Sequence, residues 1–269
     1  MKKYAKKSLG QHFLVQQNVI RKIIEKSGIS EKDTVIELGI GTGALTYELT
    51  KVANKVIGVE IDKELIEFLE EQGIPENLTI LMQDMLTLDF EKLQKEEQLK
   101  LKIFGNLPYY LSTQMIFRLI RYRKHIDWAL LMFQKEVAKR LTAKPGTKEY
   151  GIPTVILGYC ADIETIMELS PKNFRPVPKV YSSVIKITFK EPAFKLSNES
   201  LFMDLVKRAF SKRRKTLENN LKGFRRLSKD NIKQILQNCN INPKTRAEEL
   251  SCNQFVDIAN QISMILNNN

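Results

Sequence analysis

The sequence predicts an α/β fold, with a mostly parallel sheet covered by helices on both faces, followed by a small all-helical domain. Over the first two-thirds of the chain, short runs rich in Val, Ile and Leu alternate with amphipathic segments at helical spacing. This βαβ alternation is typical of parallel sheets. After residue 190 apolar residues recur only at helical spacing. We therefore expect an α/β domain at residues 1–190 and a helical domain at residues 191–269.

The elements are predicted in order from the apolar periodicity. A first helix is expected at residues 14–27, where Gly28 ends the pattern. Strands are expected at residues 34–38, 55–61, 78–82, 101–104 and 128–133, with helices at residues 44–53, 63–72 and 113–123. Two β-branched runs, at residues 162–169 and 180–189, predict an antiparallel hairpin at the sheet edge. The C-terminal helices are expected at residues 201–210, 230–237 and 253–266.

The chain is strongly basic, with 43 Lys and Arg against 31 Asp and Glu and a formal net charge of +12. Basic proteins of this size usually bind polyanions, because neutralised phosphates release counterions. Nine basic residues cluster between Lys207 and Arg226 with one acid, Glu218. The clustering favours a nucleic-acid surface over a generally solvated basic one. The contacts predicted there are Arg213, Arg214, Lys215, Lys222, Arg225 and Arg226.

Other compositional features exclude several classes of protein. No apolar run approaches the eighteen or so residues of a membrane span. The charged residues 1–7 are followed by no apolar core, so we expect no secretory signal. The three cysteines, Cys160, Cys239 and Cys252, are far apart, which argues against a zinc site or a disulfide framework. We expect a cytoplasmic protein without a metal or a membrane partner.

A glycine-rich segment lies at the junction of the first strand and the following helix. Gly39, Gly41 and Gly43 would let the backbone approach a ligand closely. Glu60 ends the second strand, where a carboxylate can accept both hydroxyls of a ribose. The same layout serves nicotinamide dehydrogenases, so this motif alone does not identify the cofactor.

Acidic residues after three successive strands favour S-adenosylmethionine as the cofactor. Glu37 and Glu60 follow the first two strands, and Asp84, beside Met85, follows the third. Asp84 could accept a hydrogen bond from an adenine amino group. S-adenosylmethionine has no phosphate to repel carboxylates, and its sulfonium and ammonium are cationic. The alternatives are a capping or solvated role for Glu37 and a turn role for Asp84.

The run Asn106-Leu107-Pro108-Tyr109 follows the fourth strand and is the most informative motif of the chain. The N6 amine of adenine is a poor nucleophile, because its lone pair is delocalised into the ring. The Asn106 side-chain oxygen and the Leu107 carbonyl could accept its two hydrogens and favour a pyramidal amine. Pro108 fixes the backbone, and Tyr109 could stack on the base. Positioning does most of the work, and no general base is needed beforehand.

An adenine must be unpaired or flipped out to reach such a pocket. Phe174 is the candidate for the face of the base opposite Tyr109. The alternative role for Phe174 is that of a core aromatic beneath the Pro-rich loop. His125 follows a charged run and is expected at the surface. His12 is considered further only because of the residues next to it.

These motifs together resemble the KsgA-type (RsmA) small-subunit rRNA adenine dimethyltransferases along nearly the whole chain. The matching segments are Gly10 to Leu14, Glu37 to Thr46, Val59 to Asp62, Gln83-Asp84, Gly105 to Ser112, Gln134 to Ala138, Phe174 to Ser183 and Phe210 to Leu217. Two positions depart from the family pattern. Ile40 stands where Pro is usual, and His12 stands where Asn is common.

The resemblance implies a Rossmann-like methyltransferase domain and a small helical C-terminal domain that binds RNA. It implies dimethylation of two adjacent adenosines near the 3′ end of small-subunit (16S) rRNA during ribosome assembly, by a protein that we expect to be monomeric. By motif position the cofactor contacts are His12, Leu14, Gly39, Gly41, Gly43, Glu60, Asp84, Met85 and Asn106. The target base would lie against Asn106 to Tyr109 and Phe174.

Three other functions stay open. An Erm-type methyltransferase, which modifies large-subunit rRNA and confers macrolide resistance, shares the glycine loop and the Asn-x-Pro-Tyr logic. The segments at residues 134–138 and 213–217 fit the KsgA type better. A ribosome-assembly factor acting mainly by binding would not need the intact run from Asn106 to Tyr109. A nicotinamide oxidoreductase leaves that run and the basic cluster unexplained.

Overall fold

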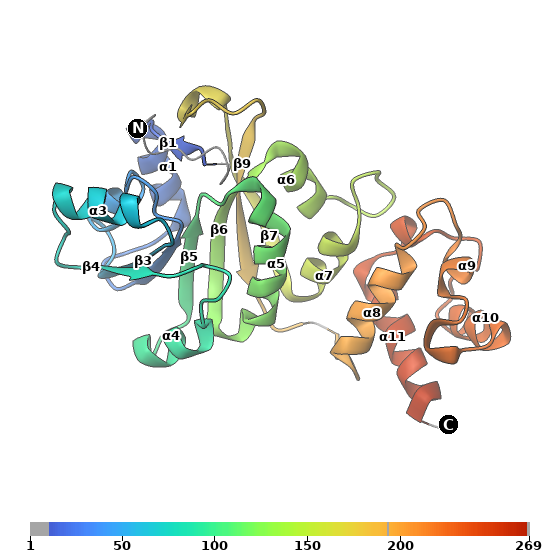
Figure 1. The fold of residues 1–269 in the computed structure, drawn as a ribbon. Coiled ribbons are helices and arrows are strands. Elements are labelled where there is room, and N and C mark those ends of the chain that lie inside the picture. The colour runs from blue at the N-terminus through green and yellow to red at the C-terminus, as the bar shows by residue number, and fades with distance from the viewer. Residues whose placement is uncertain (1–10, 193, 268–269) are drawn as a thin grey trace. The chain divides into compact units, whose positions relative to one another are not determined.

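The computed structural model describes residues 11–192 and 194–267 and contains two compact units (Figure 1). The first unit comprises the chain up to residue 138 together with residues 162–190. The second comprises residues 139–161 and the chain from residue 191 onward. The last passage of the chain from the first unit to the second is therefore between residues 190 and 191. Residues 139–161, however, group with the C-terminal helices and not with the α/β domain. Gly10, the first residue of one motif, lies outside the described part.

The first unit is built on a seven-stranded sheet in the order β4-β3-β2-β5-β6-β9-β7. Its strands are β2 (Thr34–Leu38), β3 (Lys55–Glu60), β4 (Leu78–Met82), β5 (Leu101–Gly105), β6 (Ile126–Gln134), β7 (Ala161–Leu169) and β9 (Ser182–Phe189). The first five of that order are parallel, and β9 is antiparallel to β6. The predicted α/β class is confirmed, with the two late strands at one edge.

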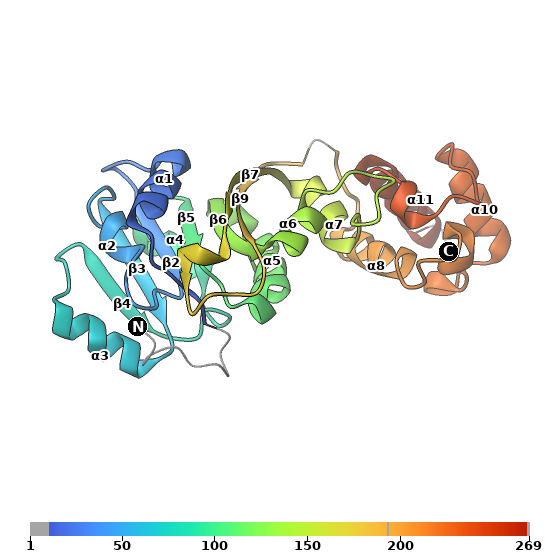
Figure 2. The same cartoon turned by 90° about the horizontal axis from the view of Figure 1, so that it is seen from above.

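Helices flank this sheet on both sides (Figure 2). They are α1 (Gln17–Ser27), α2 (Thr46–Leu49), α3 (Lys63–Gln72), α4 (Phe90–Glu97), α5 (Ser112–Arg121) and the start of α6 (Lys135–Leu141). Ile20 and Ile23 of α1 are fully buried in a core cluster that includes Val35 and Phe104 from alternate positions of β2 and β5. Successive residues of a strand point to opposite faces and alternate residues share a face, so this cluster covers one face of the sheet.

A second, two-stranded sheet joins segments far apart in the sequence. β1 (Phe13–Leu14) pairs antiparallel with β8 (Phe174–Arg175), and the Val15 amide donates to the Asn173 carbonyl at 2.9 Å. This pairing attaches the N-terminal motif to the Pro-rich loop between β7 and β9. Neither short strand is predicted from the sequence, because two residues carry no periodicity.

The second unit is helical. Its helices are α7 (Ile152–Cys160), α8 (Glu199–Ala209), α9 (Leu217–Leu221), α10 (Lys229–Asn238) and α11 (Cys252–Asn267). Asn198, Thr216 and Ser228 cap α8, α9 and α10 with their side chains. The sequence does not predict α7, because it is apolar on nearly all sides and shows no stripe. It contacts α8 and α11, which explains why residues 139–161 belong to this unit.

Candidate active site

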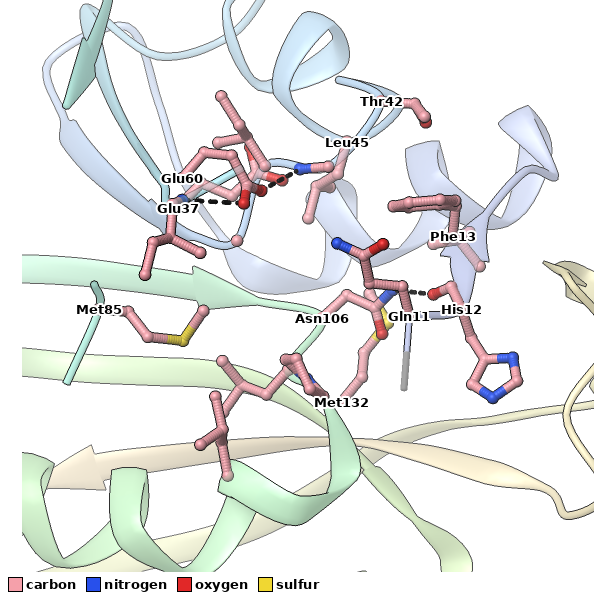
Figure 3. Close-up of a pocket in the computed structure, with 18 of the residues that line it drawn as sticks. Gln11, His12, Phe13, Glu37, Thr42, Leu45, Glu60, Met85, Asn106 and Met132 are labelled. Carbon is pink, nitrogen blue, oxygen red and sulfur yellow. Dashed lines mark hydrogen bonds between the residues drawn. The ribbon is translucent and has the colours of Figure 1, made fainter. Parts of the chain in front are cut away.

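A cavity of about 320 Å³ lies in the first unit, where β2, β3, β4 and β5 reach their carboxyl ends (Figure 3). Of the predicted residues, its lining includes His12, Leu14, Glu37, Gly39, Gly41, Glu60, Asp84, Met85 and the run from Asn106 to Tyr109. The lining also includes residues that the sequence does not single out, such as Phe13, Leu45, Tyr110 and Met132. Its volume is at the lower end of that of small-molecule sites.

The carboxylate of Glu60 is held by the backbone around the glycine loop. Its Oε2 accepts from the Gly41 amide at 3.0 Å, and its Oε1 accepts from the amides of Ile61 and Asp62 at 2.9 and 3.0 Å. Three amide donors fix the position of the carboxyl group. A carboxylate has about four acceptor positions, so Glu60 can still accept from a ligand.

Gly41 and Gly43 serve different purposes. A Cβ on Gly41 would lie 2.9 Å from the Phe13 ring, which itself lines the cavity. A Cβ on Gly43 would lie 2.6 Å from Leu69 and 2.7 Å from the Tyr47 ring, at a backbone φ of +78°. Gly43 does not line the cavity. Gly43 therefore allows α2 and α3 to pack closely, and its expected cofactor contact stays a prediction.

Glu37 is a buried acid without a full set of partners. Its side chain is 2% exposed, and Oε2 has no hydrogen-bond partner among the described residues. Burial raises the pKa of Glu37 to about 8, and the charge of nearby Glu60 adds to this rise. A cationic ligand in the cavity would stabilise the ionised carboxylate. The sulfonium and ammonium of S-adenosylmethionine meet that requirement, so the residues present fit this cofactor.

Asp84 combines both roles considered from the sequence. Its Oδ1 accepts from the Leu86 amide at 2.8 Å, and its backbone carbonyl accepts from the Thr87 hydroxyl. These bonds shape the turn after β4. The residue also lines the cavity, where Oδ2 can accept from an amino group of a ligand.

The orientation of the Asn106 side chain is determined by His12. Asn106 Nδ2 donates to the His12 carbonyl oxygen at 2.7 Å (Figure 3). A carbonyl oxygen only accepts hydrogen bonds, so the side-chain nitrogen of Asn106 must be the atom that faces His12. The other terminal atom of the Asn106 side chain is then the oxygen, Oδ1. Asn106 therefore offers an acceptor to the cavity, as the predicted chemistry requires.

The His12 ring joins Tyr109 to the Pro-rich loop. His12 Nδ1 lies 2.8 Å from the Pro176 carbonyl oxygen, so Nδ1 carries the proton. The His12 and Tyr109 rings are 5.6 Å apart, and the Tyr109 hydroxyl lies 3.1 Å from Ser182 Oγ. His12 therefore takes part in the site through both its backbone and its ring, although Asn is common at this position.

Phe174 differs from its predicted role. Its side chain is 1% exposed within the core cluster, and it is not part of the cavity lining. Strand pairing with Leu14 holds the backbone of Phe174 in β8. The ring therefore fills the core beneath the Pro-rich loop, and in this conformation it cannot stack on a base.

The basic cluster of the second unit divides into paired and unpaired side chains. Arg213 donates to the Lys148 carbonyl, and its Nε lies 3.5 Å from Glu248 Oε2. Arg225 forms an ion pair with Asp204. Arg214, Lys215, Lys222 and Arg226 are exposed and have no side-chain partner in the described part of the chain. The second set is therefore better placed to bind phosphates.

Residues 11–192 and 194–267 contain neither a candidate metal site nor a candidate membrane span. No three His, Cys, Asp or Glu side chains are grouped as a metal site would need. No helix has both the length and the apolar character that crossing a membrane takes. Of the two histidines, His125 is half-buried, lies 3.3 Å from Gln94 and is not part of the cavity lining.

We expect Gly43→Ala to destabilise the protein by about 3 kcal/mol, because backbone strain adds to the overlap with Leu69 and Tyr47. The control is Gly73→Ala, also at positive φ (+89°) but with open space around the new methyl group. It should lose only about 1 kcal/mol. Urea denaturation of both variants measures the difference. Equal losses would show that close packing at Gly43 is unimportant.

We expect Glu37→Gln to stabilise the ligand-free protein at alkaline pH. The raised pKa means that folding keeps Glu37 protonated, which costs free energy only where the unfolded carboxyl ionises. The wild type should thus lose stability relative to the variant as the pH rises from about 4.5 to about 8. The final gain should be on the order of a few kcal/mol. Thermal melts of both proteins from pH 5 to 9 test this, and a pH-independent difference contradicts it.

Known proteins resemble this chain over nearly its full length. A family model described as ribosomal RNA adenine dimethylase matches residues 2–264. The ribosomal RNA small subunit methyltransferase A of Syntrophus aciditrophicus is 42% identical over 263 residues, which cover 96% of this chain and 94% of that protein. The protein of that name from Caldanaerobacter subterraneus is 39% identical over 268 residues and covers 97% and 98% of the two chains.

Two solved structures share the fold. A dimethyladenosine transferase from Plasmodium falciparum has a TM-score of 0.79 at 28% identity, covering 91% of this chain and 95% of that one. The 23S rRNA methyltransferase ErmE has a TM-score of 0.70 at 21% identity, covering 93% and 99%. The second likeness concerns the fold alone. Together with the match over residues 2–264, these relatives show that the chain belongs to the ribosomal RNA adenine dimethylase family.

Proposed function

We propose that this protein transfers methyl groups from S-adenosylmethionine to the N6 amines of two adjacent adenosines near the 3′ end of small-subunit rRNA. The orientation of Asn106 carries the proposal. Its amide nitrogen is held by the His12 carbonyl, so an acceptor oxygen faces a cavity that is also lined by Glu37, whose Oε2 has no hydrogen-bond partner in the described part of the chain. An oxygen that can accept hydrogen bonds from the target amine and a carboxyl group that can bind a cation thus lie in one cavity.

The chain's own residues perform the positioning. Asn106 Oδ1 and the Leu107 carbonyl accept the two N6 hydrogens and favour the pyramidal amine. Tyr109, fixed by His12 and Ser182, supports the base. S-adenosylmethionine supplies, when bound, a methyl group on a positively charged sulfur. Alignment of the amine with that group accounts for most of the rate, and the proton of the methylated nitrogen leaves to water afterwards.

The small-subunit target is favoured over the Erm alternative. Relatives named ribosomal RNA small subunit methyltransferase A are 38–46% identical to this chain, whereas ErmE is 21% identical. An oxidoreductase is excluded by family membership. A pure assembly factor would not need the acceptor geometry of Asn106.

We also propose a binding surface, a substrate and a location for this protein. The helical C-terminal domain would bind rRNA through the unpaired basic residues of its cluster. The substrate would be a partly assembled small subunit, and the protein would act as a cytoplasmic monomer. The excess of 43 basic over 31 acidic residues supports a polyanionic partner.

The proposal is tested by mapping N6,N6-dimethyladenosine in both rRNAs from cells with and without this protein. Loss of the modification near the 3′ end of the small-subunit RNA is expected in its absence. Loss only in large-subunit RNA would favour the Erm type, and no loss in either RNA would leave a binding role.

Asn106→Ala should lower the methylation rate by about 10²- to 10³-fold, the usual effect of removing a preorganised group that acts on the reacting atoms. RNA affinity should change little, because Asn106 contributes one contact of many. Rates and RNA binding are measured on purified protein. The matched control is Asn54→Ala, an exposed asparagine whose side chain has no partner in the described structure. Weakened RNA binding with a normal rate would contradict the role of Asn106.

Replacing Arg214 and Lys215 together with Ala should weaken RNA binding and flatten its salt dependence by about one unit of slope per lost phosphate contact. Arg213→Ala should instead lower thermal stability, because Arg213 contacts Lys148 and Glu248. The charge-matched control replaces Lys229 and Lys233 of α10, which are also exposed. An equal change of slope in the control would mean that net charge alone is responsible.

A further inference from the structure

Exposed apolar side chains gather on two segments beside the cavity. Tyr110 is 59% exposed and lines the cavity, so it forms part of the rim. In the loop before β9, Val177, Val180 and Tyr181 are 54%, 41% and 52% exposed. Water contact on this many neighbouring apolar groups is unfavourable, and such patches commonly mark a binding surface.

The two segments are joined at Tyr109. Tyr110 follows Tyr109 directly, and Tyr181 directly precedes Ser182, whose Oγ lies 3.1 Å from the Tyr109 hydroxyl. Ser182 pairs with Gln134, at the carboxyl end of β6. In Figure 1 the loop that leads into β9, drawn in yellow, lies beside β1 at this end of the sheet. Tyr181 is therefore a close neighbour of the residue that supports the target base.

Tyr181 is held in place before any ligand binds. Its carbonyl accepts from the Lys135 amide at 2.9 Å, and the Lys135 ammonium lies 5.7 Å from the centre of its ring. Lys135 is fixed in turn by Glu168, at 2.8 Å. An exposed ring with a restrained backbone loses little conformational freedom when a flat group stacks on it.

The loop that carries Tyr181 is positively charged. Residues 170–182 contain Lys172, Arg175 and Lys179 and no acid, and all three basic residues are exposed. Aromatic rings next to Lys and Arg form the usual platform for single-stranded nucleic acid, in which rings stack on bases and cations contact phosphates. The mixture of aromatic and basic groups thus fits an RNA strand better than an apolar protein segment.

A stacking surface beside the cavity would stabilise the RNA when the target base enters the pocket. A base that enters the pocket leaves the stack, and its neighbours lose a stacking partner. Phe174, the aromatic expected near the base, is buried in the core. We propose that Tyr181 stacks on the base of a nucleotide next to the target adenosine, with Tyr110 on the cavity side and Lys172 and Lys179 contacting its phosphates. This inference rests on the proposed function.

The test uses the full chain and a short single-stranded RNA with two adjacent adenosines and the fluorescent base 2-aminopurine beside them. Stacking on Tyr181 should quench the fluorescence on binding. Tyr181→Ala should remove the quenching and weaken RNA affinity about tenfold, within the range for one lost stacking contact. Tyr181→Phe should behave as the wild type, because the ring is retained. Leu99→Ala is the control, since Leu99 is 53% exposed and precedes the amino end of β5, whereas the cavity lies at the carboxyl ends of the strands.

Methylation kinetics on isolated small subunits provide the second measurement. Tyr181→Ala should raise KM for the subunit with little change in kcat. Wild-type KM and unchanged quenching in this variant would overturn the inference. Wild-type affinity for the short RNA combined with a raised KM for the subunit would place a protein on this surface and also overturn it. Failure of the proposed function is distinct, because then the wild type itself would not methylate the subunit.

Discussion

The site depends on the parallel pairing of β2 with β3 on one side and β5 on the other. The register matches Leu38 with Val59 and with Gly105, so the three strands end at the same level. The residues that follow, Gly39 and Asn106, therefore enter one cavity together with Glu60 at the end of β3. Parallel strands concentrate functional groups at their carboxyl ends for this reason. A shift of one residue in either pairing would turn these side chains to the wrong face.

Two acids in this cavity have different hydrogen-bond surroundings. Glu60 accepts from three backbone amides, which fix the position of its carboxyl group. Glu37 has an unpartnered oxygen and a pKa of about 8, chiefly because it is buried. Glu60 can accept hydrogen bonds from neutral hydroxyl groups, whereas ionisation of Glu37 becomes favourable when a cation binds beside it. The cavity is therefore complementary to a ligand that carries both kinds of group.

The N-terminal segment completes the site from a distance of nearly one hundred residues. His12 accepts from Asn106 through its carbonyl and donates to Pro176 through its ring. The pairing of β1 with β8 holds this segment against the loop before β9. The target-base motif, the cofactor cavity and the exposed ring of Tyr181 are thus connected by a few hydrogen bonds. A change in this segment should affect all three.

The sequence by itself determined the features that local patterns encode. Apolar periodicity predicts the parallel strands and most helices, and residue types at strand ends predict Glu60, Asp84 and Asn106 in the cavity. The tertiary structure alone decided the pairing of β1 with β8 and the burial of Phe174. It also decided the packing role of Gly43, the ion pair of Arg213 and the place of residues 139–161 with the C-terminal helices. These features depend on contacts between residues far apart in the chain, and a buried ring, a solvated ring and a base-stacking ring have the same local sequence signal.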